Sequence, residues 1–226
     1  MSFVAAEHHL GVSRTARYWT LGNTAAGMRE VWFVCHGYGQ LAGRFIRRFT
    51  SIASAERCVL APEALSRFYL DGTGMHGPDS PVGASWMTRE DRLNEIEDYI
   101  AYLDALHDRV VAGRNVRVVA LGFSQGVSTV ARWAARTSRA IGHVVLWSGG
   151  WPPELTPGAT LFGKARLTIV IGEADPAMSA PAADTLIARL GAAGLKTARI
   201  SHAGGHEVTE DALAALLARL RMDSGM

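Results

Sequence analysis

One serine of this chain stands in a pattern that suits it to act as a nucleophile. Residues 122–126 read GFSQG, which places a glycine two residues before and two residues after Ser124. At a sharp turn from a strand into a helix, flanking glycines leave room for a strained serine whose hydroxyl stands clear of the backbone. Such a hydroxyl could attack a carbonyl carbon. The alternative is a glycine-rich turn whose serine only caps the following helix.

A serine acts as a nucleophile when a histidine removes its proton and a carboxylate orients that histidine. Two later segments offer these groups in the order Ser, Asp, His, each directly after a run that predicts a strand. Asp175 follows the run at 166–171, and His206 follows the run at 196–201. We therefore expect Asp175 to be the carboxylate and His206 to be the base.

Each of these two groups has a rival nearby in the sequence. Glu173 comes shortly before Asp175, and Asp175 is preferred because it lies later in the loop and next to a proline. His202 comes shortly before His206, and His206 is preferred because the Gly-Gly pair at 204–205 lets the backbone turn inward.

Acyl transfer also needs N–H donors for the negative oxygen that forms during attack. In a strand–turn–helix arrangement one donor is the N–H of the residue after the nucleophile, here Gln125. The other comes from the loop after an early strand. The run at 31–35 predicts that strand, and HGYGQ at 36–40 predicts the loop, with the N–H of Tyr38 as the second donor. We expect His36 to stabilise this loop by hydrogen bonding, because one base is enough.

The elements that must hold these residues alternate along the chain. Apolar, β-branched runs predict strands near 14–21, 31–35, 57–61, 116–121, 143–147, 167–171 and 196–201. Helical spacing of apolar residues predicts helices near 41–55, 90–112, 126–137, 180–193 and 207–221. This alternation predicts a single α/β domain over residues 1–226, with a mainly parallel central sheet and helices on both faces. The length leaves no room for a large cap domain.

Two long irregular segments are expected at 71–87 and 148–163, both after strands and rich in glycine and proline. Ligands bind at the carboxyl edge of such sheets, where these segments begin. Trp86, Met87 and Trp151 are therefore candidate walls of the substrate pocket. The alternative, that the tryptophans only anchor their loops, has nearly equal weight.

Four ordered motifs extend the argument: HGxG at 36–39, GFSQG at 122–126, GxxD at 172–175 and GGHE at 204–207. With them the chain resembles the phospholipase/carboxylesterase family of α/β-hydrolases, which includes acyl-protein thioesterases and small carboxylesterases. The resemblance runs from about residue 32 to the last helix. It implies the α/β-hydrolase fold and the same catalytic and oxyanion residues as the reasoning above.

The chain departs from the family pattern at three points. Tyr38 stands where the family commonly has an aliphatic residue, and Gln40 stands where an acidic residue is common. Asp175 is followed by Pro-Ala rather than by the usual Val-Pro. These departures lie at the entrance and at the aspartate loop, so they bear on the substrate rather than on the acid–base roles.

Charge and motif content exclude several classes of function. The 23 basic and 21 acidic residues give a net charge of +2, which argues against nucleic-acid binding. No CxxC or HExxH spacing occurs, and the serine chemistry needs no cofactor or metal. Arg44, Arg47 and Arg48 cluster on one side of the predicted helix 41–55, where a solvated basic face is expected rather than a lipid-binding patch.

The two cysteines, Cys35 and Cys58, both fall in apolar runs, which is typical of buried free thiols in a reducing compartment. The first 20 residues contain no apolar core of a signal peptide, and no run is long enough to span a membrane. We therefore expect a cytoplasmic location. The sequence leaves the oligomeric state open.

Together these features predict a serine hydrolase that cleaves short- to medium-chain carboxylic esters or thioesters of small molecules. The alternatives are a lysophospholipase or acyl-protein thioesterase, a peptidase or amidase with the same triad, and a non-catalytic binding protein of hydrolase fold. The last is disfavoured because such a protein need not keep the complete triad.

Overall fold

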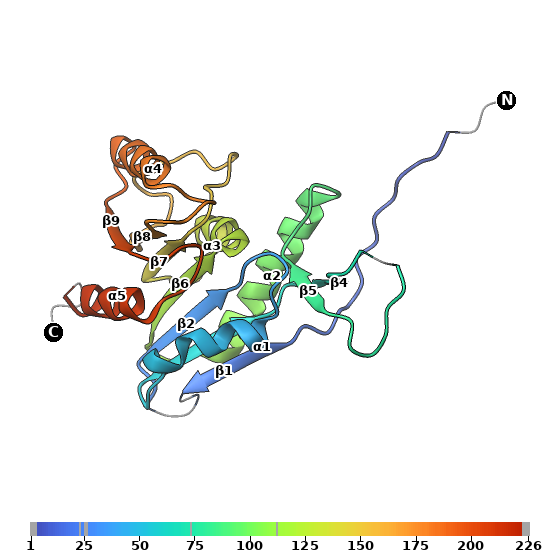
Figure 1. The fold of residues 1–226 in the computed structure, drawn as a ribbon, viewed down its shortest axis with the longest axis horizontal. Coiled ribbons are helices and arrows are strands. Elements are labelled where there is room, and N and C mark those ends of the chain that lie inside the picture. Colours follow the sequence, from blue (N-terminus) through green and yellow to red (C-terminus); the bar gives the residue numbers. More distant parts are fainter. Residues whose placement is uncertain (1–3, 23, 25–26, 73, 112, 223–226) are drawn as a thin grey trace.

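The computed structural model describes residues 4–22, 24, 27–72, 74–111 and 113–222. Within these residues, a seven-stranded sheet has the order β1-β3-β2-β6-β7-β8-β9 (Figure 1). Its strands are β1 Tyr18–Gly22, β2 Glu30–Cys35, β3 Arg57–Pro62, β6 Arg117–Phe123, β7 His143–Trp147, β8 Arg166–Gly172 and β9 Thr197–His202. Only the pairing of β1 with β3 is antiparallel; the other pairs of neighbours are parallel.

Helices cover both faces of this sheet (Figure 1). They are α1 Ala42–Phe45, which continues as the 3-10 helix η1 Ile46–Ile52, then α2 Arg92–Val111, α3 Gln125–Arg136, α4 Ala180–Ala192 and α5 Glu210–Met222. Alternate residues of β2 enter two separate cores. Phe33 packs in the core with α2, α3 and α4, whereas Trp32 and Val34 pack in the core with α1, η1 and α5. The predicted α/β class, with a mainly parallel sheet between helices, is confirmed.

A second, two-stranded sheet corrects one prediction. β4 Ser66–Tyr69 pairs antiparallel with β5 Val82–Ser85, so that the segment 71–87 expected to be irregular ends in a strand. Gly83 of β5 hid this strand, because a glycine inside a run usually signals a turn. In the structure a Cβ at Gly83 would lie 2.5 Å from the carbonyl oxygen of Gly39, so the glycine permits contact with the loop 36–40.

The insertions between the strands of the main sheet are small. Within the described residues they comprise the β4–β5 hairpin, single helices and irregular loops, and no cap domain is present. The predicted helix 41–55 is shorter than expected, because it ends at Ile52 and its second half is a 3-10 helix. Of the helices in the described part of the chain, none has the length and apolar character needed to cross a bilayer.

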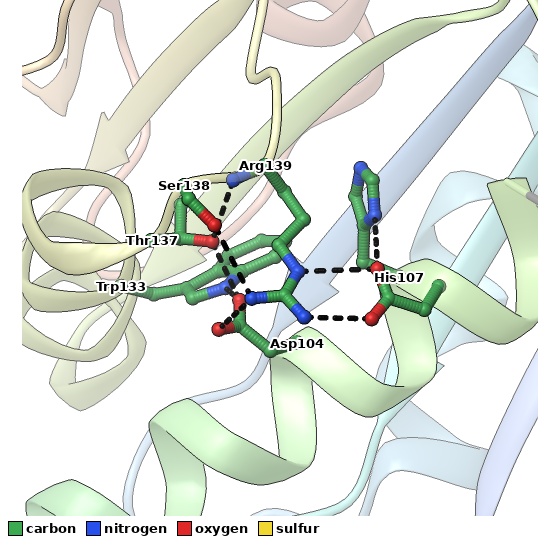
Figure 2. A network of polar contacts seen from close by, with 7 residues as sticks. Asp104, His107, Trp133, Thr137, Ser138 and Arg139 are labelled. Carbon is green, nitrogen blue, oxygen red and sulfur yellow. Dashed lines mark hydrogen bonds and ion pairs between the residues drawn. The ribbon is translucent and has the colours of Figure 1, made fainter. Parts of the chain in front are cut away.

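A polar network fixes α3 against α2 (Figure 2). One carboxylate oxygen of Asp104 accepts hydrogen bonds from the Trp133 indole at 2.8 Å and from the Thr137 hydroxyl at 2.6 Å. The other pairs with Arg139 at 2.9 Å. The network thus fixes the C-terminal end of α3 to α2.

Both cysteines are buried free thiols, as expected. Burial raises the pKa of Cys58 to about 11 and raises the pKa of Cys35 further. Both side chains therefore remain neutral and serve as small apolar residues of the core.

Replacement of Gly122 by alanine is expected to lower the free energy of unfolding by about 3 kcal/mol, since overpacking of this kind displaces backbone. The added Cβ would lie 2.1 Å from the carbonyl oxygen of Gly126. Gly191→Ala in α4 is the matched control, because nothing lies within 4 Å of its Cβ position. Urea unfolding measures both, and Gly191→Ala should raise stability by about 0.5–1 kcal/mol. A Gly122→Ala protein as stable as the wild type would contradict this account.

Candidate active site

The turn between β6 and α3 holds Ser124 in a strained conformation. Its φ is 55° and its ψ is −117°, a combination that non-glycine residues rarely adopt. Gly126 makes the turn possible, because a Cβ there would lie 2.2 Å from the carbonyl oxygen of Cys35. Ser124 occupies the N-cap position of α3, yet its side chain makes no capping hydrogen bond. The hydroxyl is therefore not used for capping, which disfavours the purely structural alternative.

His206 and Asp175 lie in hydrogen-bond contact across two loops. The Nδ1 atom of His206 is 3.0 Å from each carboxylate oxygen of Asp175. Asp175 is buried with only 4% of its surface exposed, whereas the His206 side chain keeps 29% exposed. This geometry fixes the imidazole through one nitrogen and leaves its other nitrogen available for a second partner.

The two rival residues are located differently. Glu173 is exposed, whereas Asp175 is buried. His202 is buried, and its Nδ1 accepts a hydrogen bond from the backbone N–H of Gly204 at 3.2 Å. Its ring packs 5.9 Å from that of Trp147. The geometry thus favours Asp175 and His206 over both rivals.

The surroundings of Asp175 keep its carboxyl ionised. Burial opposes ionisation, but the Ser148 hydroxyl, the Ala177 amide and the His206 ring together hold the pKa of Asp175 below its ordinary value. The Ala177 N–H donates to the carboxylate at 2.8 Å. A carboxylate kept negative in this way can stabilise a positive charge that develops on His206.

The residue that precedes Ser124 packs against His206. The ring of Phe123, the residue before the serine, lies 4.8 Å from the ring of His206. Both Ser124 and His206 are partly exposed, so a substrate can approach them from solvent. On the other side, a Cβ at Gly37 would lie 3.0 Å from the Cβ of Ser124. The loop 36–40 therefore passes directly against the serine.

Most backbone amides of this loop already have partners. The N–H of Gly37 donates to the Gln40 side chain at 2.9 Å, and the N–H of Gly39 donates to the carbonyl of Ala84 at 2.9 Å. The N–H of Gln40 donates to the carbonyl of Gly37 at 3.2 Å. Across the described residues, the Tyr38 N–H has no acceptor. It is therefore available to a ligand, as the predicted donor role requires.

Gln125 offers a backbone amide, and its side chain holds the backbone of residues 86–87. As the first residue of α3, it has an N–H without an acceptor inside the helix. Its side-chain carbonyl accepts a hydrogen bond from the Trp86 N–H at 3.1 Å, and its side-chain amide donates to the Met87 carbonyl at 2.8 Å. The sequence analysis missed this second role. Its only signal was a polar side chain at the start of an otherwise buried helix.

Trp86 anchors the loop and is not an exposed wall of a pocket. Only 2% of its surface is exposed, and its indole N–H donates to the carbonyl of His36 at 2.8 Å. Met87 and Trp151 are half-buried. The Trp151 indole donates to the carbonyl of Leu155 at 2.8 Å, which folds the loop 148–163 back on itself.

His36 stabilises the loop, as predicted. Its ring is fully buried, with Nδ1 donating to the carbonyl of Gly37 at 2.8 Å and Nε2 accepting from the N–H of Ala64 at 3.1 Å. Both nitrogens are thus occupied in the neutral tautomer, and burial lowers the pKa of His36 from its ordinary value.

One group of side chains in the described residues has the spacing to hold a metal ion. The ligand atoms of Glu7, His9 and Asp91 lie within 4.8 Å of one another. All three residues are exposed, and none belongs to the set around Ser124. Exposed groups of this kind are common without an ion, so they add nothing to the site.

Known structures share this architecture. The chain has the α/β-hydrolase fold. It is similar to a carboxylesterase from Mesorhizobium loti, with 20% identity, a TM-score of 0.70 and coverage of 91% of this chain and 94% of that chain. Zea mays acyl-protein thioesterase 2 is similar at 16% identity, with a TM-score of 0.68 and coverage of 92% and 99%.

A phospholipase/carboxylesterase from Dyadobacter fermentans is similar at 17% identity, with a TM-score of 0.60 and coverage of 91% of this chain and 96% of that chain. These neighbours are of the kind that the four motifs resemble, and at such identities they establish the fold. No protein-family model matches the sequence, and no curated protein gives a significant match.

The buried His36 is expected to make stability depend on pH. Its pKa in the folded state lies below the ordinary value of 6.5, so the unfolded chain takes up a proton that the folded chain resists. The free energy of unfolding should therefore decrease as pH falls from 7 to 5. His36→Asn should reduce the steepness of this decrease, measured by urea unfolding at several pH values. An identical pH slope in the two proteins would contradict the assignment.

Proposed function

We propose that this protein is a serine hydrolase acting on carboxylic esters or thioesters. The observation that carries the proposal is the hydrogen-bonded pair of His206 and Asp175, together with a strained Ser124 whose hydroxyl does not cap α3. The fold neighbours support hydrolase chemistry, because those named above are esterases and a thioesterase. A serine that only shaped the turn would need neither the imidazole nor the buried carboxylate.

In the proposed mechanism the Ser124 hydroxyl attacks the acyl carbon while His206 removes its proton. The N–H groups of Tyr38 and Gln125 donate to the oxygen that becomes negative in the tetrahedral intermediate. His206 then gives its proton to the leaving alcohol or thiol, and an acyl-enzyme remains on Ser124. A water molecule, deprotonated by His206, attacks the acyl-enzyme, and His206 returns this proton to the Ser124 oxygen as the acid is released. Asp175 orients the imidazole throughout and stabilises its positive form.

The small insertions support a modest acyl site. A large catalytic pocket needs walls supplied by long insertions, and the described residues provide the β4–β5 hairpin and the loop 148–163 instead. We propose an open groove that accepts short- to medium-chain acyl groups. Trp151, half-buried in the loop 148–163, remains the proposed wall, whereas the burial of Trp86 favours its anchoring role.

Ser124→Ala should abolish nearly all esterase activity and all labelling by a fluorophosphonate. The oxyanion donors and binding alone would leave a rate about 10³–10⁴-fold over water. Alanine is compatible with the turn, so circular dichroism should show a folded protein. Retained turnover or labelling at the active site would refute the nucleophile assignment.

The same assay separates the base and the carboxylate from their rivals. His206→Ala should lose about as much activity as Ser124→Ala, whereas His202→Ala should keep most of it. Asp175→Asn should reduce kcat far more than Glu173→Gln does, because Asp175 orients the base and Glu173 does not. An inactive His202→Ala protein beside an active His206→Ala protein would reverse the assignment of the base.

Acyl-chain preference is expected to rise from acetate and to fall before palmitate. Each methylene that the groove buries adds about 0.8 kcal/mol of binding until the chain meets an obstruction. A series of p-nitrophenyl esters, measured below micelle formation, gives kcat/KM for each length. Trp151→Ala should move the optimum to longer chains if the indole closes the groove. A wild-type preference for palmitate over butyrate would favour lysophospholipid or acyl-protein substrates instead.

A further inference from the structure

A small groove opens beside the loop 36–40, and two arginines line it. Its volume is about 240 Å³. Polar backbone and side-chain atoms of Gly39 and Gln40 form one end. The remaining lining residues are four apolar side chains and two cationic ones, namely Leu41, Phe45, Leu70, Val82, Arg44 and Arg48.

The two arginines carry positive charge without a counter-charge. Both line the same groove, so their like charges repel each other. Across the residues that the structure describes, no carboxylate pairs with Arg44 or Arg48, and none lines the groove. Asp71, which follows Leu70, is engaged with His76 at 3.0 Å. The groove therefore has a mixed polar and apolar lining and two exposed guanidinium groups that pair with no carboxylate of the described residues.

The groove borders the candidate active site. Phe45 forms one of its walls and stacks on Phe123 at 5.9 Å, and the ring of Phe123 lies 4.8 Å from that of His206. Gln40, at the other end, accepts the hydrogen bond from Gly37, the residue that passes against Ser124. The groove and Ser124 thus both lie against the loop 36–40.

We propose that this groove binds an anionic group, a carboxylate or a phosphate, that the substrate carries in addition to its scissile ester or thioester. Guanidinium groups bind both anions through paired N–H donors, which makes Arg44 and Arg48 the binding residues. The apolar walls contact the part of the substrate that links the anion to the scissile bond. This inference rests on the proposed hydrolase function and narrows its substrate class.

Arg47 provides a matched control on the same helical segment. Like Arg44 and Arg48 it is exposed and positively charged, but it does not line the groove. A basic face that is merely solvated would make Arg44, Arg47 and Arg48 equivalent. A specific anion site makes Arg44 and Arg48 different from Arg47.

The test compares esters that share a four-carbon acyl group and differ in charge. Phenyl butyrate, 4-(butyryloxy)benzoate and 4-(butyryloxy)phenyl phosphate place no anion, a carboxylate or a phosphate on the leaving group. 4-Nitrophenyl butyrate and mono-4-nitrophenyl succinate place the difference on the acyl side. In the double variant Arg44→Gln/Arg48→Gln, the KM of an anionic ester relative to its neutral counterpart should rise about tenfold at low salt. Added salt should shrink this effect, and Arg47→Gln should leave the ratio as in the wild type.

Several results would overturn the inference. An unchanged ratio in the double variant, with esterase activity retained, would remove the anion site and leave the proposed function intact. An equal effect of Arg47→Gln would indicate a general field of the basic face. An effect confined to esters in anionic vesicles would indicate a lipid surface instead. If the wild type hydrolyses none of these esters and Ser124 takes up no fluorophosphonate, the proposed function fails and the inference fails with it.

Discussion

The candidate site depends on one close crossing of backbones. Gly126 in the first turn of α3 lies so near the end of β2 that a Cβ would be 2.2 Å from the carbonyl oxygen of Cys35. Gly122 approaches Gly126 just as closely from β6. Ser124 lies between these two glycines, and the loop 36–40 begins directly after Cys35. The same contact therefore sets the position of the serine and of the backbone amides of the loop 36–40. Other interactions then refine this arrangement.

Around that crossing, the loops are held by side chains that bond to backbone. The Trp86 indole holds the carbonyl of His36, the His36 ring holds the amide of Ala64, and the Gln125 side chain holds the segment at 86–87. These groups are buried, so leaving one of them unpaired costs about 1–3 kcal/mol. The result is a loop whose amides keep their directions before any ligand arrives, which is the condition for electrostatic stabilisation of an oxyanion.

Features set by local pattern could be predicted from the sequence, and features set by distant contacts could not. The central strands are continuous apolar runs, and the pairing of Asp175 with His206 follows from their positions after two predicted strands. β5 was missed because Gly83 serves a contact with the loop 36–40 rather than a turn. The burial of Trp86 was equally hidden, because its acceptor is 50 residues away and a tryptophan in a glycine-rich segment can be either wall or anchor. The second role of Gln125 depends on that same segment.

The order of the strands also bears on edge-to-edge association of the sheet. β9 forms one edge of the main sheet, and an open edge strand is a template on which another chain can add a strand. This strand follows the exposed Lys196 and carries the exposed Arg199, which pairs with Asp184 of α4. Charged side chains on an edge strand disfavour the addition of a further strand. The sheet that supports the site thus ends in a strand whose chemistry protects the folded chain against edge-to-edge aggregation.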